Sequence, residues 1–228
     1  MNIAIIPARG GSKRIPRKNI KAFHGKPMIA YSIEAAVNSQ CFDKIIVSTD
    51  DAEIAKIAIK HGAEVPFIRP DNISDDYATT LDVIKHAVEF TESQGWAVKN
   101  VCCIYATAPF LLPEFIKKGF RELTSANIDY AFSATSFPFP IQRALRLNDE
   151  QCVEMFQPEH FNTRSQDLEE AYHDAGQFYW GTAEAFIEKK AIFGSNSKAI
   201  LLPRKRVQDI DTPEDWDLAE ALYRVVEC

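Results

Sequence analysis

The sequence alternates between two apolar patterns, and this alternation restricts the possible fold more than any other feature. Short β-branched or apolar runs, each typical of a buried strand, cover residues 2–7, 44–48, 64–68, 101–105 and 130–135. Between them, apolar residues recur three and four apart, as on one face of a helix. Strands that alternate with helices build a mostly parallel sheet with helices on both faces. The sequence therefore predicts a three-layer α/β/α fold.

Signals for helix ends agree with this alternation. We expect Pro27 and Pro113 to occupy first helical positions, and Asp50 to cap the helix that follows the second strand. Two pairs have the spacing of a capping box: Thr79 with Asp82, and Thr212 with Asp215. The pattern thus predicts where these helices begin as well as that they exist.

The alternation stops at Phe137 and resumes near Ala175. Residues 137–170 begin with Phe-Pro-Phe-Pro and show no clean period, so we interpret them as an insertion with a strand or two that reaches toward a partner subunit. Strand, short helix and strand then follow at 175–180, 182–188 and 198–202. We expect residues 1–228 to form a single domain.

Positive charge is concentrated at the start of an otherwise acidic chain. The chain has 26 basic and 32 acidic residues, yet the first 33 residues contain seven basic residues and no acid. Such a local charge suits a small polyanionic ligand, although a solvated basic loop has the same composition. The acidic remainder would repel an extended phosphate backbone, which argues against a nucleic-acid partner.

Other features bear on the compartment. No apolar run approaches the roughly 18 residues that cross a bilayer, and the start does not have the pattern of a signal peptide. The five cysteines, among them Cys102, Cys103 and Cys228, are odd in number and form no C-x-x-C motif. We therefore expect a cytoplasmic protein with reduced thiols and no membrane contact.

The loop after the first strand has the composition of a phosphate site. In open parallel sheets, ligands bind beyond the carboxyl ends of the strands, and residues 8–13 leave the first strand at such an end. Gly10 and Gly11 allow close backbone approach, so their N–H groups can cradle phosphate oxygens. The loop matches neither G-x-x-x-x-G-K-[ST] nor G-x-G-x-x-G, so it lacks the P-loop and dinucleotide fingerprints.

Two carboxylates stand near the carboxyl terminus. Asp209 and Asp211 would point to the same side of an extended segment, which suits a divalent cation such as Mg²⁺. Thr212 and Pro213 mark a helix start directly afterwards, so for the acids taken alone their position before a helix is the favoured explanation, ahead of metal binding.

Several motifs, in order, resemble one enzyme family. Ile5-Ile-Pro-Ala-Arg-Gly-Gly-Ser-Lys-Arg14, Pro16-Arg-Lys-Asn19, Ile46-Val-Ser-Thr-Asp50, the segment from Arg69 to Thr80 and Asp209-Ile-Asp211 are similar to motifs of the acylneuraminate cytidylyltransferases, or CMP-sialic acid synthetases. The resemblance spans nearly the whole chain. Tyr172-His-Asp-Ala-Gly-Gln-Phe-Tyr-Trp-Gly181 is most like the branch that acts on pseudaminic acid.

The resemblance implies a nucleotide-diphospho-sugar transferase fold and a reaction. The anomeric hydroxyl of a nonulosonic acid attacks the α-phosphorus of CTP, and pyrophosphate leaves. It further implies dependence on Mg²⁺ and a homodimer in which the insertion packs on the partner. The product would supply surface glycans or glycosylated flagellin.

The resemblance also implies site residues. Those implied for the nucleotide are Arg9, Gly10, Gly11, Ser12, Lys13, Lys18, Asn19, Arg69 and Thr80; Arg9, Lys18 and Asp211 would be catalytic, and Asp209 and Asp211 would hold the metal. Those implied for the sugar are Tyr105, Arg143, Arg164, His173, Gln177 and Tyr179. Thr80 taken alone is equally a residue of a helix start, and we expect Phe178 and Trp180 to pack in the core on alternate strand faces.

Three other functions remain open at this point. The sugar could be legionaminic or N-acetylneuraminic acid. A glycosyltransferase could use Asp209 and Asp211 as its metal motif, without needing the basic loop. A phosphate-ligand or RNA-binding module would show salt-dependent affinity without nucleotide turnover.

Overall fold

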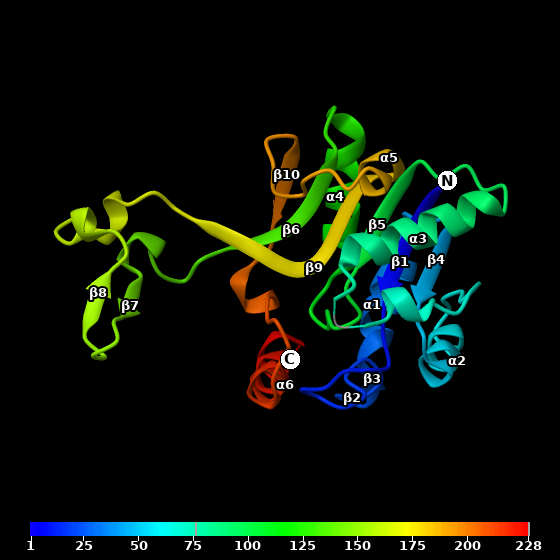
Figure 1. Ribbon diagram of the computed structural model, residues 1–228, viewed down its shortest axis with the longest axis horizontal. Coiled ribbons are helices and arrows are strands. Elements are labelled where there is room, and N and C mark those ends of the chain that lie inside the picture. Colours follow the sequence, from blue (N-terminus) through cyan, green and yellow to red (C-terminus); the bar gives the residue numbers. More distant parts are fainter. Residues whose placement is uncertain (76, 228) are drawn as a thin grey trace.

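The structure is a computed structural model that describes residues 1–75 and 77–227. A six-stranded sheet forms its centre (Figure 1). The strand order is β10-β6-β9-β5-β1-β4. In chain order these strands are β1 (Asn2–Pro7), β4 (Lys44–Ser48), β5 (Asn100–Ile104), β6 (Tyr130–Ser136), β9 (Tyr172–Thr182) and β10 (Ser197–Leu201). The β1 and β4 bounds agree with the prediction residue for residue.

Most neighbouring strands are parallel, and β9 is the exception. β1 runs parallel to β4 and β5, and β6 runs parallel to β10, whereas β9 is antiparallel to both β5 and β6. The chain leaves the sheet at the carboxyl end of β6, and after the insertion β9 begins beside that same end, where Tyr172 pairs with Ser136 (Figure 1). A strand that re-enters beside the end of its predecessor must run in the opposite direction.

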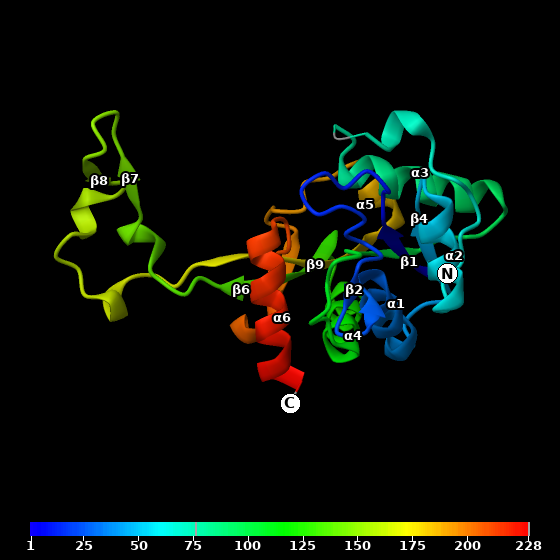
Figure 2. The same cartoon turned by 90° about the horizontal axis from the view of Figure 1, so that it is seen from below.

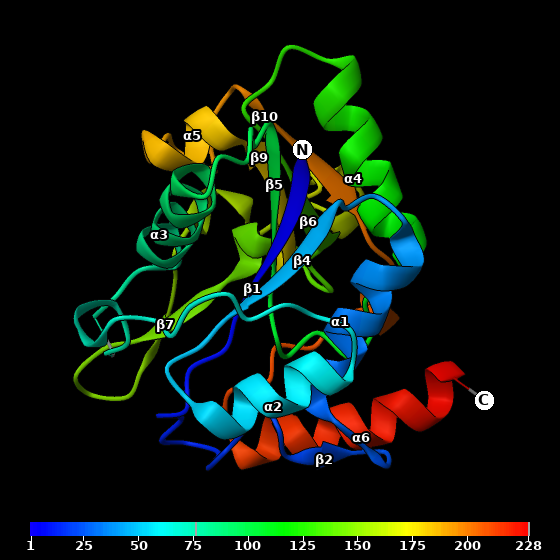
Figure 3. The ribbon, with the colours of Figure 1, turned by 90° about the vertical axis from the view of Figure 1, so that its right-hand side faces the viewer.

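Helices cover both faces of the sheet, as predicted (Figure 3). α1 (Met28–Ser39), α2 (Ala52–Lys60) and α4 (Pro113–Ser125) bury apolar residues with Ala4 and Ile6 of β1. α3 (Thr80–Ser93) and α5 (Ala183–Ile187) do so with Ile3 and Ile5 on the opposite face. Alternate residues of one strand thus face separate apolar layers, which is the signature of a sheet buried on both sides.

The last helix, α6 (Pro213–Glu227), belongs to a third apolar cluster. A short hairpin of β2 (Ala22–Phe23) and β3 (Lys26–Pro27) places Phe23 edge-to-face against Trp216 and Tyr223 of α6. This contact ties the end of the chain to the basic N-terminal segment. It therefore brings the two acids before α6 next to the loop after β1.

The insertion projects away from the sheet as an arm (Figures 1 and 2). It contains a hairpin of β7 (Leu145–Leu147) and β8 (Val153–Met155), with short 3₁₀ turns on either side. We call residues 137–171 the arm. Its two connections, the chain after β6 and the chain before β9, run side by side in both views.

Three local expectations were wrong. Residues 64–68 form no strand, only a single bridge between Ile46 and Glu64, because Pro66 cannot donate to a ladder. Asp51, not Asp50, caps α2, by accepting from two N–H groups of its first turn. Pro27 precedes α1 and pairs in β3 instead of opening the helix.

The other structural expectations concern the capping boxes, the thiols and membrane-spanning helices. The Thr79–Asp82 capping box is present, and Asp215 accepts from Thr212 as the second box requires. Cys41, Cys102, Cys103 and Cys152 are free thiols, and Cys228 lies outside the described residues. Within the described ranges, no helix is both long and apolar enough to span a membrane.

Candidate active site

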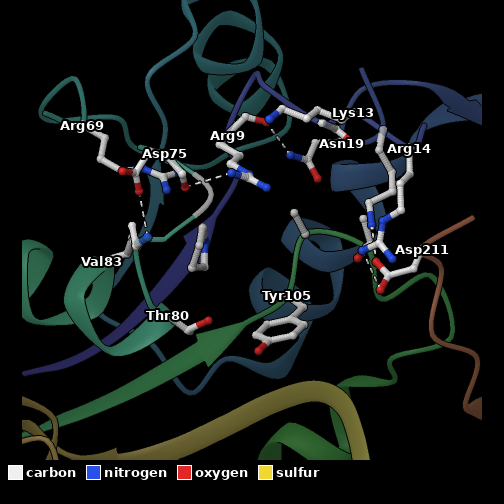
Figure 4. Close-up of a pocket in the computed structure, with 16 residues that line it drawn as sticks. Arg9, Lys13, Arg14, Asn19, Arg69, Asp75, Thr80, Val83, Tyr105 and Asp211 are labelled. Atoms are coloured by element: carbon white, nitrogen blue, oxygen red, sulfur yellow. Dashed lines mark hydrogen bonds and ion pairs between the residues drawn. The ribbon is translucent and has the colours of Figure 1, made fainter. Parts of the chain in front are cut away.

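A cavity of about 650 Å³ opens beyond the carboxyl ends of β1 and β5, between the basic loop and the start of α3 (Figure 4). Residues singled out from the sequence that line it are Arg9, Ser12, Lys13, Lys18, Asn19, Arg69, Thr80, Tyr105 and Asp211. They follow the first and third predicted strands, border the fourth, and precede the last helix. The topology thus brings distant residues to one edge of the sheet, as ligand sites in such sheets require.

Two side chains hold the basic loop in place through hydrogen bonds to its backbone. The Gly10 N–H donates to Asp50 Oδ1 at 2.9 Å, and Asn19 Nδ2 donates to the Arg9 carbonyl at 2.9 Å. The loop therefore has a defined shape before any ligand binds. Asp50 was missed as a site residue because it was interpreted as a cap; its place just past the end of β4, beside β1, is the signal that could have found it.

Gly10 packs directly on a charged pair. An added Cβ would lie 2.7 Å from Asp51 Oδ2. Asp51 cannot retreat, because it caps α2 and forms a bidentate contact with Arg17. The Arg17 contact holds the pKa of Asp51 down at about 2, so the pair is ionised at neutral pH. Gly11, in contrast, has nothing within 4 Å of its Cβ position.

These two glycines provide a matched test. The resemblance implies that this loop binds CTP, so Gly10→Ala is expected to weaken CTP binding about tenfold or more, because overpacking of about 1–3 kcal/mol would displace the loop. Gly11→Ala, one residue along with open space, is expected to bind within about twofold of the parent protein. Isothermal titration calorimetry with CTP compares them; equal effects would contradict a role for the fit between Gly10 and Asp51.

Two arginines border the opposite side of the cavity. Arg9 donates from Nη1 to the Asp75 carbonyl at 2.8 Å (Figure 4). Arg69 is only 4% exposed, and its Nη2 donates to the Ser48 carbonyl at 2.7 Å. Burial lowers the pKa of Arg69, and its Nε is buried with no hydrogen-bond partner in the described part of the chain. A buried guanidinium with an unused donor is suited to an electron-rich ligand group.

The acidic pair lies at the other end of the cavity. Asp211 Oδ2 is 2.9 Å from Arg14 Nη2, and its Oδ1 is 3.2 Å from Lys18 Nζ. Lys18 also donates to the Ile210 carbonyl at 2.5 Å, so it fixes the segment that carries both acids. Burial, then the nearby charge of Asp211, raises the pKa of Asp209. Arg14 was not singled out from the sequence, although it belongs to the same basic run.

The nearby carboxylate of Asp215 caps α6 and accepts from the Asp211 N–H at 3.1 Å. No group of three or more His, Cys, Asp or Glu side chains with the geometry of a metal site occurs among residues 1–75 and 77–227. Asp211 lines the cavity, whereas Asp209 does not. Two carboxylates alone match Mg²⁺, which retains several waters and takes its remaining ligands from substrate phosphates.

The residues expected for the sugar fall into four places, the last of which is the arm. Tyr105 lines the cavity, and Tyr179 and Gln177 are buried behind it. His173 lies at the base of the arm, its ring 4.8 Å from that of Phe137. Gln177 donates to the Arg206 carbonyl, in the turn that precedes the acidic pair.

Arg143 and Arg164 lie on the arm, away from the cavity of their own chain (Figure 1). Arg143 donates to the Thr163 carbonyl, and Arg164 pairs with Asp167 at 2.6 Å. Within one subunit the structure therefore does not bring them to the site. The reason is topological, because both belong to the insertion and not to the alternating pattern.

The expectation for Phe178 and Trp180 was half right. Both are buried, but they lie on the same face of β9, where they contact Gly119 of α4. Residues two apart in a strand share a face, so alternate faces were the wrong prediction. Tyr179, between them, faces the other layer together with Tyr105.

Comparison with known proteins extends this description. A family described as Cytidylyltransferase matches residues 3–225. Pseudaminic acid cytidylyltransferase of Campylobacter jejuni is 50% identical over 98% of this chain and 97% of its own length. CMP-N,N'-diacetyllegionaminic acid synthase of Legionella pneumophila is 33% identical over 98% and 96% of the two chains.

Solved structures agree on the fold. The structure of CMP:2-keto-3-deoxy-manno-octonic acid synthetase complexed with CTP aligns with a TM-score of 0.70, 16% identity and 98% coverage of each chain. A 4-diphosphocytidyl-2C-methyl-D-erythritol synthase from Anaerococcus prevotii aligns with a TM-score of 0.64 at the same identity and coverage. The predicted nucleotide-diphospho-sugar transferase fold is thus confirmed. The sequence match over nearly the whole chain shows that this protein belongs to the cytidylyltransferase family.

Proposed function

We propose that this protein transfers CMP from CTP to the anomeric hydroxyl of pseudaminic acid and releases pyrophosphate. The observation that carries this proposal is the 50% identity, over nearly all of both chains, to a pseudaminic acid cytidylyltransferase. The more distant legionaminic and N-acylneuraminate relatives, at 33% and 31%, support the same chemistry on related sugars. We further propose that the reaction takes place in the cytoplasm.

The cavity has the charge distribution that this reaction needs. Arg9, Lys13 and Lys18, with the backbone of residues 10–12, would hold the triphosphate of CTP. Asn19, Arg69 and Thr80 would hold the nucleoside. In-line displacement at phosphorus requires alignment and charge neutralisation and no covalent intermediate, and these residues would supply the alignment and part of the neutralising charge. Lys18, anchored on the Ile210 carbonyl, would link the phosphate loop to the acidic pair.

We propose Asp209 and Asp211 as the ligands of Mg²⁺. The fit rests on their chemistry, since carboxylate oxygens are the hard ligands that Mg²⁺ takes and Asp211 lines the cavity together with Lys13 and Lys18 of the basic segment. When bound, the ion would neutralise phosphate charge. Arg14 and Lys18 hold the Asp211 carboxylate at the cavity wall.

An assay of pyrophosphate release from CTP, in the presence of Mg²⁺, tests the function directly. Parallel reactions contain pseudaminic, N,N'-diacetyllegionaminic or N-acetylneuraminic acid. Release with pseudaminic acid in clear preference supports the proposal. Preference for another nonulosonic acid would keep the nucleotide chemistry and overturn the assigned sugar. If none of the three sugars leads to pyrophosphate release, the result counts against cytidylyl transfer to this class of sugar.

We also propose that the arm packs against a second copy of this chain. Phe139 and Phe161 of the arm are 78% and 73% exposed, and Phe137–Ile141, Arg143, Ala144 and Ser165 line an apolar groove of about 580 Å³. Exposed apolar surface of this kind is typical of an interface. In such a homodimer, Arg143 and Arg164 could reach the cavity of the partner subunit, where a carboxylate of the sugar would need an arginine.

The arm makes a prediction about oligomeric state. Phe139→Asp is expected to shift the protein from dimer to monomer at micromolar concentration, because a buried aspartate without a partner destabilises an apolar interface by several kcal/mol. Val225→Asp is the matched control, since Val225 is 79% exposed on α6. Light scattering coupled to gel filtration measures both; a dimeric Phe139→Asp, or a monomeric parent, would contradict the proposal.

A further inference from the structure

Arg17, in the segment that follows the two glycines of the basic loop, has an unfavourable backbone conformation. Its φ is +56°, in the left-handed region that glycine adopts freely and arginine does not. The Arg17 carbonyl accepts from the N–H groups of Ile20 and Lys21 at 2.9 Å each, so this conformation belongs to a hydrogen-bonded turn. Strained backbone persists where surrounding contacts hold it, and it is common at functional sites. The side chain of Arg17 supplies such contacts.

The Arg17 guanidinium binds the start of α2 through two carboxylates. Its Nη1 and Nη2 donate to the two oxygens of Asp51 at 2.5 and 3.0 Å, and Nη2 also donates to Glu53 Oε2 at 2.5 Å. Asp51 is the N-cap of α2, and Glu53 lies in its first turn. A bidentate pair between arginine and carboxylate fixes direction as well as distance. Arg17 therefore attaches the basic segment to one defined point on α2.

The same part of α2 holds the basic loop at a second point. The Gly10 N–H donates to Asp50 Oδ1 at 2.9 Å, and Gly10 packs directly on Asp51. The chain between these two attachments includes residues 12–14, which line the cavity. Figure 3 shows the loop after β1 beside the start of α2. A segment attached at both ends loses less conformational entropy when it binds a ligand, so these attachments preorganise it.

Arg17 acts from outside the cavity. Arg14 and Lys18 line the cavity on either side of it in the sequence, whereas Arg17 is not among the lining residues. The segment also has an apolar anchor, because Ile15 is 3% exposed and packs in the third cluster with Phe23. The segment thus stays attached to the protein without the Arg17 ion pairs. What these pairs add is a fixed position for the residues beside them.

We propose that Arg17 is a positioning residue, whose ion pairs with Asp51 and Glu53 hold the basic loop in the shape that receives the triphosphate of CTP. This inference rests on the proposed role of the loop in holding that triphosphate. It adds a residue that does not itself touch the nucleotide.

Arg17→Gly tests the proposal, because glycine suits the backbone better than arginine does. The substitution relieves the unfavourable φ while it removes the three hydrogen bonds to α2. We expect the CTP dissociation constant from isothermal titration calorimetry to rise about five- to tenfold. The unfolding temperature should change little, and kcat at saturating CTP should stay within about twofold, because bound CTP restores the shape of the loop.

Gln40→Gly is the matched control. Gln40 is the C-cap of α1, it is exposed, and its φ of +53° is close to that of Arg17. Glycine therefore relieves a similar backbone conformation at a residue that does not line the cavity. The CTP dissociation constant of this variant should equal that of the parent protein.

Asp51→Asn separates positioning from charge. Asparagine caps a helix as well as aspartate does, but it lacks the negative charge that pairs with Arg17. Charge alone predicts tighter CTP binding, since a negative group beside the basic loop is removed. Positioning predicts binding about threefold weaker or more. Since both residues act through one contact, Asp51→Asn should add little to Arg17→Gly in the double variant. Arg17→Lys, which keeps the charge without the bidentate geometry, should be intermediate.

Three results would overturn the proposal: an unchanged CTP dissociation constant in Arg17→Gly, tighter CTP binding by Asp51→Asn, or losses that add in full. If Arg17→Gly does not fold, Arg17→Lys and Asp51→Asn still give the decisive comparison.

Failure of this inference can be distinguished from failure of the proposed function. CTP binding that is weakened by Arg9→Ala but not by Arg17→Gly contradicts the role of Arg17 alone. CTP binding that neither variant weakens contradicts the assignment of the loop to the triphosphate. Neither measurement needs a sugar, so both are independent of the assay that tests pseudaminic acid.

Discussion

Replacing Asp211 with asparagine is expected to lower the turnover number for pyrophosphate release by about a hundredfold or more, in a protein that remains folded. Asp211 is the acid that lines the cavity, and it contacts Lys18 and Arg14 at 3.2 and 2.9 Å. Asparagine keeps its shape but removes the negative charge that the proposed Mg²⁺ needs. Loss of one electrostatic contact to a reacting phosphate costs about 10²–10³ in rate.

Asp217→Asn is the matched control for this substitution. Asp217 lies on α6, six residues further along the chain, with its side chain exposed, and should support normal turnover. The Mg²⁺ concentration that gives half-maximal rate is measured for both variants and is expected to rise only for Asp211→Asn. Normal turnover with an unchanged metal requirement in Asp211→Asn would exclude Asp211 as a metal ligand.

The order of the layers could be predicted because it follows from local patterns. Each of the two faces of β1 is apolar, and the capping box at Thr79 and Asp82 fixes the start of α3 by itself. The basic loop was also predictable, since glycines and lysines at the end of the first strand have few other uses. These features depend on residues that are neighbours in the chain.

The unpredicted features depend on residues that meet only after folding. The direction of β9 follows from the path of the arm, which has no periodic pattern. Asp50 and Asp51 are adjacent, and only the position of β1 decides that one holds Gly10 while the other caps α2. The hydrogen bond from the Tyr179 hydroxyl to Asp174 requires the shift in register of β9 against β6, because residues five apart in a regular strand face opposite sides.

Arg9→Ala is expected to reduce kcat/KM for CTP by about a hundredfold without loss of the fold. Arg9 lies at the cavity wall in the basic loop, and its guanidinium reaches across to the Asp75 carbonyl at 2.8 Å. With CTP bound, it would exchange this neutral acceptor for phosphate oxygens. Charge-assisted hydrogen bonds contribute about 1.5–3 kcal/mol each, so a bidentate contact accounts for the expected loss.

Two further variants separate charge from geometry at this position. Arg9→Lys keeps the charge but not the planar pair of donors, and is expected to recover only part of the lost rate. Arg121→Ala, on the exposed surface of α4, removes the same side chain away from the cavity and should be normal. Full recovery by lysine would show that Arg9 acts only through its charge. An Arg9→Ala variant that retains near-normal kcat/KM would contradict the role of Arg9 in holding the phosphates of CTP, because the other cations of the cavity, Lys13 and Lys18, would then bind them unaided.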